Sequence, residues 1–149
     1  MNTTVVTESG EAFVQTVDEV DRYGHTQLML AARDGDLPLT RDLLQSGANL
    51  AARSDKGKTA LHYAAANGRA EVVQLLLANG ADIDARDWQG HTPLMLAANY
   101  GCTQTVDVLI SNGADILATT PAGNTAMVYA ECNRHSQSLS LLMRSLRPS

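Results

Sequence analysis

The feature that most constrains the fold is a stretch of about a dozen residues that recurs four times at a constant step of 33 residues. The copies read "GHTQLMLAARDG" from Gly24, "GKTALHYAAANG" from Gly57, "GHTPLMLAANYG" from Gly90 and a degenerate "GNTAMVYAECNR" from Gly123. Self-similarity at a fixed period is typical of repeat architectures, in which each unit buries its apolar face against the next. We therefore predict four structural units stacked in a row.

Each copy predicts a pair of helices. A threonine stands at the same place in every copy, and Thr92 with Pro93 after it is a suitable N-cap and first helical position. The apolar run that follows mixes alanines with large side chains, which predicts an inner helix closely packed on both sides. Gly68 ends this helix in the second copy, and "AEVVQLLLANG" predicts a second, apolar-striped helix that Gly80 closes. The turn-rich links between copies predict extended loops or short hairpins.

These columns resemble the ankyrin repeat, whose pattern runs D-x-x-G-x-T-P-L-H-x-A-A, then G, a leucine-rich helix and G-A-D. The second copy matches it best, with "DKGKTALHYAAANGRAEVVQLLLANGADIDA" from Asp55 onward. The resemblance implies an all-α repeat fold, an ankyrin solenoid of four stacked helix-turn-helix units joined by loops or short β-hairpins. We place the units at residues 21–53, 54–86, 87–119 and 120–149, which together form one repeat domain over residues 21–149.

The last unit departs from the pattern as a capping unit should. Glu131 replaces the second alanine of its pair and Arg134 replaces the glycine. In addition, "SQSLSLLMRSLRPS" places serines and arginines among its leucines. A final helix with one face in water needs such polar residues, so we expect the stack to end on this helix.

Residues 1–20 do not align with the repeat. Phe13, Val17 and Val20 are spaced by four and three residues, which predicts one amphipathic helix after Ser9. We expect it to be an N-terminal capping helix that lies over the exposed face of the first unit.

Composition narrows the class of protein. A chain of 149 residues with 44% apolar residues is typical of one folded domain. Its formal net charge of -5 offers no broad basic surface, so nucleic acid is disfavoured as a partner. The chain has no apolar run long enough for a membrane span and no secretory start, which predicts a cytoplasmic protein without a membrane partner. Its two cysteines suit a reducing compartment, where ordinary packing is favoured over a disulfide.

No group of residues predicts catalysis. His25 and His91 share one column two units apart, which is too far for one metal ion. His62 stands where the ankyrin pattern has its histidine, and we expect its ring to hydrogen-bond neighbouring loops. No serine or cysteine has a recognisable histidine and acid, and no glycine-rich loop follows a strand. We predict no catalytic, cofactor-binding or metal site, and no cofactor.

The resemblance implies that partners bind to the loop tips and to the exposed ends of the first helices, which line a concave face. Carried over unit by unit, the candidate partner-binding residues are Arg22, Tyr23, His25, Arg33, Asp34, Asp55, Lys56, Lys58, Asn67, Trp88, Gln89, His91, Asn99 and Tyr100.

Two aromatics of the third unit stand out in this set. Trp88 and Tyr100 occupy columns that hold small or charged residues in the first two units. Exposed aromatics are favoured anchors of interfaces, so we predict that Trp88 anchors a partner. The alternative is that its ring lies flat across the neighbouring loop.

The second loop is rich in basic residues. Arg53, Lys56, Lys58 and Arg86 lie among aspartates, and we interpret them as solvated loop charges. An acidic partner segment remains open at this loop.

Together these observations predict a noncatalytic, monomeric module that binds another protein, whose identity the residues do not specify. Two alternatives stay open within a noncatalytic role: a structural or self-assembling scaffold, and a secreted effector that binds a foreign host protein. A third is an enzyme whose site has no recognisable motif.

Overall fold

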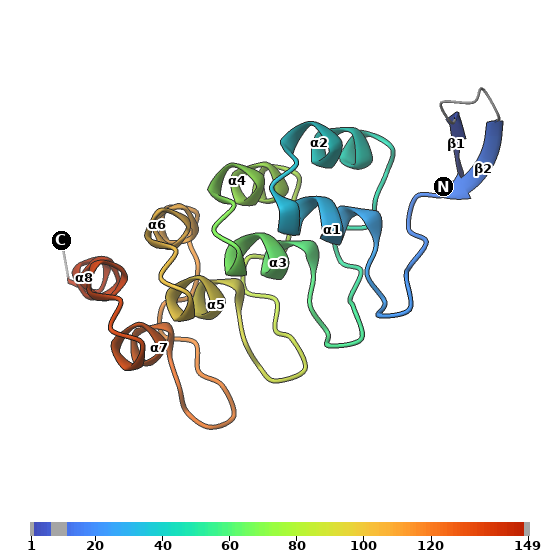
Figure 1. Cartoon of the computed structure of the whole chain (residues 1–149). Helices are drawn as coiled ribbons and strands as arrows, with labels where there is room; N and C mark the ends of the chain where they lie inside the picture. The colour runs from blue at the N-terminus through green and yellow to red at the C-terminus, as the bar shows by residue number, and fades with distance from the viewer. Residues whose placement is uncertain (1, 7–11, 148–149) are drawn as a thin grey trace.

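The computed structural model describes residues 2–6 and 12–147, with side chains from residue 17 onward. The helices of this part of the chain are α1 (Gln27–Asp34), α2 (Leu37–Gln45), α3 (Ala60–Ala66), α4 (Ala70–Ala78), α5 (Pro93–Asn99), α6 (Thr103–Ser111), α7 (Ala126–Cys132) and α8 (Ser136–Ser145). Figure 1 shows them as four pairs in a row, with α1, α3, α5 and α7 in one layer and their partners in a second. The links between pairs project as long loops on the side of the first layer. The predicted all-α solenoid of stacked helix pairs is confirmed.

Local sequence explains where the inner helices begin. Thr26 Oγ1 accepts a hydrogen bond from the Met29 N–H at 3.2 Å, and Thr92 Oγ1 accepts one from the Met95 N–H at 3.3 Å. These bonds satisfy N–H groups that have no partner within the helix. The threonine column therefore marks the start of each inner helix, as its position before the apolar run predicts.

The core runs through the whole stack because the columns place like residues in like layers. Leu28, Leu61 and Leu94 are at most 1% exposed, and Ala64 and Ala97 between them are fully buried. Burial of each large side chain contributes about 1.5–3 kcal/mol, and the alanines let the inner helices approach closely. Each unit depends on its neighbours for this burial.

Arginines hold the loops to one another. Arg53 Nη1 donates to the Gly57 carbonyl at 2.8 Å in its own loop and to the Arg86 carbonyl at 2.6 Å in the next. Arg86 Nη1 repeats the arrangement, with Gly90 at 3.1 Å and Thr119 at 2.6 Å. Both arginines are exposed, as the interpretation as solvated loop charges predicts, but their guanidinium groups also bridge backbone carbonyls of consecutive loops.

The predicted N-terminal capping helix is wrong. Residues 2–6 and 12–16 form strands β1 (Asn2–Val6) and β2 (Ala12–Thr16), which pair antiparallel. β1 (NTTVV) is mostly threonine and valine, and β2 (AFVQT) contains phenylalanine, valine and threonine. Such β-branched and aromatic residues favour a strand over a helix. Residues 10 and 11 of the expected helix lie outside the described residues. Figure 1 shows the hairpin beyond the first helix pair and apart from it.

The last unit has an uncovered end. Arg134 has a positive φ of 59°, a conformation that glycines hold at the same place in the other units. Leu142 of α8 is fully buried, whereas Met143 of α8 and Leu146 just after its end are 54% and 39% exposed. The exposed residues of α8 also include Gln137, Ser140 and Arg144. Its uncovered face is therefore polar with some apolar residues, as a final helix requires.

Candidate functional site

A groove of about 220 Å³ opens on the inner-helix side of the stack, between the second and fourth units. Apolar atoms of Ala66, Met95 and Leu96 lie along it. Its polar lining comes from loops and inner helices together: Lys58, Gln89, His91, Asn99, Tyr100 and Tyr129. We call this feature the inner groove. Its volume is below the roughly 300–1,000 Å³ of typical small-molecule sites, so it suits one or two side chains of a larger partner.

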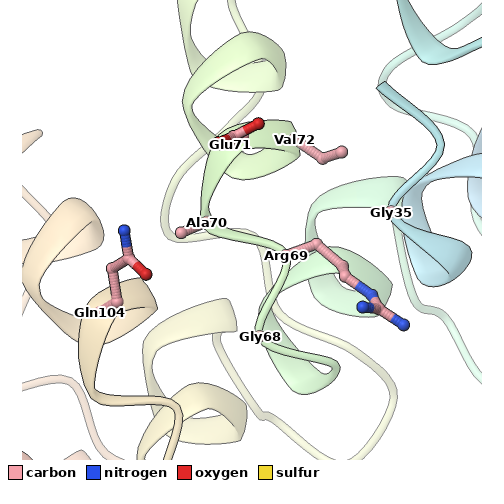
Figure 2. A pocket seen from close by; sticks show the side chains of 7 residues that line it. All are labelled: Gly35, Gly68, Arg69, Ala70, Glu71, Val72 and Gln104. Atoms are coloured by element: carbon pink, nitrogen blue, oxygen red, sulfur yellow. The ribbon is translucent and has the colours of Figure 1, made fainter. Parts of the chain in front are cut away.

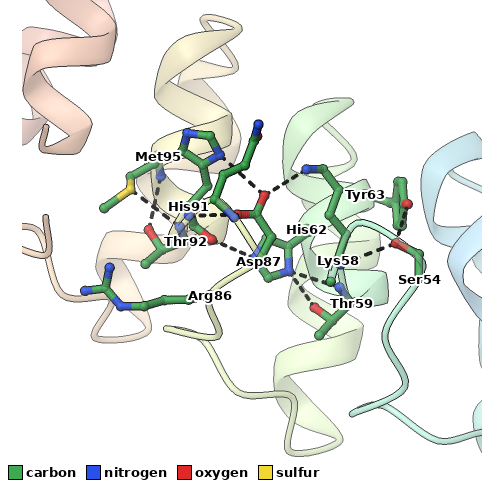
Figure 3. Close-up of polar contacts among 12 residues, drawn as sticks. Ser54, Lys58, Thr59, His62, Tyr63, Arg86, Asp87, His91, Thr92 and Met95 are labelled. Carbon is green, nitrogen blue, oxygen red and sulfur yellow. Dashed lines mark hydrogen bonds and ion pairs between the residues drawn. The ribbon is translucent and has the colours of Figure 1, made fainter. Parts of the chain in front are cut away.

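A buried carboxylate lies beside the inner groove, and Figure 3 shows its contacts. The side chain of Asp87 is fully buried, and Lys58 Nζ stands 2.8 Å from its Oδ2. Its Oδ1 accepts from the backbone N–H groups of Gln89 at 3.0 Å and His91 at 2.9 Å. Burial alone would raise the pKa of Asp87, but Lys58 and these N–H groups together lower it below its usual range. The carboxylate is thus ionised, and it fixes the shape of the third loop.

His91 joins this loop to the last unit. Its Nδ1 lies 3.4 Å from Asp87 Oδ2, and its Nε2 lies 3.0 Å from the Tyr129 hydroxyl. The first unit has the same arrangement, because His25 Nε2 lies 3.1 Å from the Tyr63 hydroxyl. The two histidines are 66 residues apart, as are the two tyrosines, so this contact repeats every second unit. Between the second and third units the ion pair of Lys58 takes its place.

His62 has the structural role that its place in the pattern predicts. Its ring is fully buried, Nδ1 accepts from the Thr59 N–H at 3.1 Å, and Nε2 donates to the His91 carbonyl at 2.9 Å. Because a backbone N–H can only donate, the ring is the neutral form with its proton on Nε2. Burial lowers the pKa of His62. The predicted bond to a neighbouring loop is confirmed.

Trp88 lies across the neighbouring loop, as the alternative interpretation of its ring predicts, and is exposed as well. Its ring lies against Gly57 of the preceding loop so closely that a Cβ there would collide with it, and Arg53 Cζ lies 5.4 Å from the ring centre. The side chain nevertheless remains 66% exposed. Tyr100, at the end of α5, is 61% exposed and lines the inner groove. The third unit therefore presents two large aromatic surfaces to solvent.

The structure brings only part of the predicted set together. Five of its residues line the inner groove: Lys58, Gln89, His91, Asn99 and Tyr100. Exposed positions on the loop tips are held by Arg22, Tyr23, Asp55, Lys56 and Trp88. At the ends of inner helices, Arg33 and Asp34 pair with each other at 2.9 Å, and Asn67 Nδ2 donates to the Tyr63 carbonyl at 2.8 Å.

Sequence reasoning missed Asp87 and Tyr129. A signal for Tyr129 was present, because a tyrosine follows the histidine by 38 residues in both the first and third units.

A second depression, of about 250 Å³, lies where α3 turns into α4 (Figure 2). Arg69 is one of the residues that line it, and its Nε donates to the Arg33 carbonyl at 3.0 Å. Its guanidinium thereby satisfies a carbonyl at the end of α1. The other residues that line the depression include no histidine, cysteine or serine, so its described lining offers no nucleophile and base.

The described residues contain no group of three or more His, Cys, Asp or Glu side chains able to hold a metal ion. Cys102 and Cys132 are both free thiols, and burial raises the pKa of Cys102. None of the helices described is long and apolar enough to cross a membrane.

Two family models match the chain. One describes three copies of the ankyrin repeat and matches residues 7–87, and the other describes many copies and matches residues 76–130. A comparison with curated proteins finds no match.

Proposed function

Because the chain belongs to the ankyrin repeat family, we propose that it is a noncatalytic module whose partner protein docks on the loop tips and the inner groove. Ankyrin repeats are generally protein–protein interaction modules, and the family is typically non-catalytic. The observation that carries the proposal is the pairing of a groove with exposed aromatics in the third unit. Trp88 and Tyr100 are each about two-thirds exposed, and rings of this kind are enriched among residues that dominate binding energy.

The rigidity of the loops supports this proposal. Arg53 and Arg86 bridge consecutive loops, and the buried Asp87 carboxylate accepts hydrogen bonds from backbone N–H groups of the third loop. A surface that is already ordered loses little conformational freedom when a partner binds. The loop tips can therefore contribute to affinity without first having to be fixed in place.

Self-assembly by end-to-end stacking is less well supported. Within the stack, the ring of His135 packs directly against Gly101, where a Cβ would stand 2.6 Å from its Nδ1. The equivalent position at the C-terminal end is Arg134, whose Cβ occupies that space. A second copy stacked in the same register would bring its Asp36 against the Arg134 Cβ where the other interfaces have a glycine, so we propose that the molecule acts as a monomer.

The test is capture of partners by immobilised protein. Wild type and a Trp88→Ala, Tyr100→Ala double variant are exposed to lysate of the source cell, and retained proteins are identified by mass spectrometry. A Leu117→Ala, Met143→Ala variant serves as the control, because these side chains are 60% and 54% exposed outside the inner groove. All three proteins must show the same melting curve.

We expect a protein that wild type and control retain and the aromatic variant loses. Its purified form should then bind the aromatic variant at least about tenfold more weakly, as hot-spot truncation implies. Equal retention by all three proteins would contradict the proposed face.

A further inference from the structure

We propose that the inner groove receives a carboxylate of the partner, so that the segment bound there is acidic with an apolar residue beside the acid. This inference rests on the proposed function and specifies the chemistry of the partner. It comes from the hydrogen-bonding capacity that the groove has left over.

The charged groups at the groove differ in how many of their hydrogen-bonding positions are already occupied. Asp87 is fully buried, and its two oxygens already accept two backbone N–H groups and the Lys58 ammonium. Lys58 uses one of its three N–H donors in this bond, and 19% of its side chain is exposed. A partner therefore meets an ammonium with donors remaining, whereas the carboxylate is out of reach.

The neutral groups at the groove also have donors left over. Asn99 Oδ1 accepts from Asn133 Nδ2 at 2.8 Å, and the Asn99 carbonyl lies 3.0 Å from His135 Nε2. Within the described part of the chain, no hydrogen bond engages Asn99 Nδ2, the Gln89 side chain or the Tyr100 hydroxyl. An ionised carboxylate only accepts, so it can engage the spare donors of Lys58 Nζ and Asn99 Nδ2. The Gln89 amide N–H and the Tyr100 O–H can donate to it as well.

Charge around the groove points the same way. The chain carries a formal net charge of -5, yet basic residues gather at this loop. Exposed Lys56 lies on the same loop as Lys58, and the guanidinium of Arg53 stacks on the Trp88 ring, which lies against that loop. Exposed Asp55 of this loop is directed toward the first unit, where its Oδ1 packs against Gly24. An acidic segment is thus attracted to this place on a molecule that is acidic as a whole.

The apolar lining of the groove indicates which residue should stand beside the acid in the partner segment. Ala66 and Leu96 line it beside the donors, with Tyr100 exposed at its edge. A carboxylate seated at Lys58 places the residue next to it against these carbons. The inferred segment is therefore an aspartate or glutamate adjacent to an aliphatic or aromatic residue.

The probe is a phage library of random dodecapeptides selected on immobilised full-length protein. We expect enrichment of Asp or Glu next to Leu, Ile, Val or Phe. One enriched peptide is then synthesised, and its affinity for wild type and variants is measured by fluorescence polarisation.

The informative variant is Asn99→Asp, which adds a negative charge and removes the spare donor while keeping an oxygen for Asn133. The matched control is Gln104→Glu, which makes the same charge change at an exposed position beside the depression of Figure 2. Because loss of a hydrogen bond to a charged group costs about tenfold or more in affinity, we expect that weakening for Asn99→Asp and near wild-type binding for Gln104→Glu. Gln89→Glu on the loop is the second variant, used if Asn99→Asp does not show the wild-type circular dichroism spectrum.

Three results would overturn the inference: no acidic enrichment, equal weakening in the groove variant and the control, or full binding by the groove variant. If the selected peptides lack acids but lose binding on Trp88→Ala, the carboxylate site is refuted and the proposed function stands. If no selected peptide depends on either Trp88 or Asn99, both proposals fail.

Discussion

Substitutions at two positions of the same column, Gly101→Ala and Arg134→Gly, should change the free energy of unfolding in opposite directions. Both residues hold a left-handed backbone, with φ of 69° at Gly101 and 59° at Arg134. They differ in their surroundings. A Cβ at Gly101 would stand 2.6 Å from Nδ1 of His135, whereas the Arg134 side chain is exposed.

The magnitudes follow from these surroundings. A side chain in the left-handed region costs the folded state about 1–2 kcal/mol relative to glycine. Glycine loses about 0.4–1 kcal/mol of this advantage, because it gives the unfolded chain more conformational freedom. Arg134→Gly should therefore stabilise the protein by about 0.5–1 kcal/mol. Gly101→Ala incurs similar strain and also displaces the His135 ring, whose 3.0 Å contact with the Asn99 carbonyl contributes about 1 kcal/mol. A loss of about 1.5–2 kcal/mol is expected, from the same net cost of about 0.5–1 kcal/mol and the lost His135 contact.

Urea unfolding followed by circular dichroism measures both changes. Arg134→Ala is the control, because it removes the guanidinium but keeps the Cβ, and it should unfold close to wild type. The reasoning fails if Arg134→Gly is no more stable than Arg134→Ala, or if Gly101→Ala is as stable as wild type.

Three further outcomes are expected. Lys58→Met leaves the buried Asp87 carboxylate without its ammonium and should cost about 2–4 kcal/mol in urea unfolding at pH 7, and a loss below about 1 kcal/mol would contradict the ion pair. Because the pKa of His62 is lowered in the folded state, its contribution is complete above the unfolded value of about 6.5 and is lost as pH falls through the folded value. Unfolding free energy should thus fall less steeply below pH ~6.5 in His62→Gln than in wild type, and equal slopes would refute this. Gly57→Ala should lift Trp88, the single tryptophan, off the second loop and shift its fluorescence to the red, whereas an unchanged spectrum would show that the ring does not rest there.

The repeated columns made most of the fold predictable. Once Thr92 and Gly101 are recognised as the start and end of an inner helix, the same assignment holds at a 33-residue step in each unit. The N-terminal segment lacks that redundancy. The spacing of Phe13, Val17 and Val20 fits a helix, but β2 is stabilised by pairing with β1, and no short periodic pattern contains information about that partner.

For the candidate site, exposure was more predictable than contact. A residue's column fixes whether it faces solvent, and Trp88 and Tyr100 are exposed as that argument predicts. Arg53 and Lys58 look like ordinary loop charges in sequence, because their partners lie 33 and 29 residues further on. Only the stacking of loops brings those groups together, so their roles depend on the three-dimensional fold.

The alternation of histidine and tyrosine contacts determines how the length of this protein could change. Deleting residues 54–86 alone would place Leu96 where His25 now meets the Tyr63 hydroxyl, and the contact would be lost. Deleting residues 54–119 would instead present Tyr129 to His25 and restore it. A shortened or extended protein therefore keeps its His–Tyr contacts only when units are removed or added two at a time, which makes the pair of units the interchangeable module.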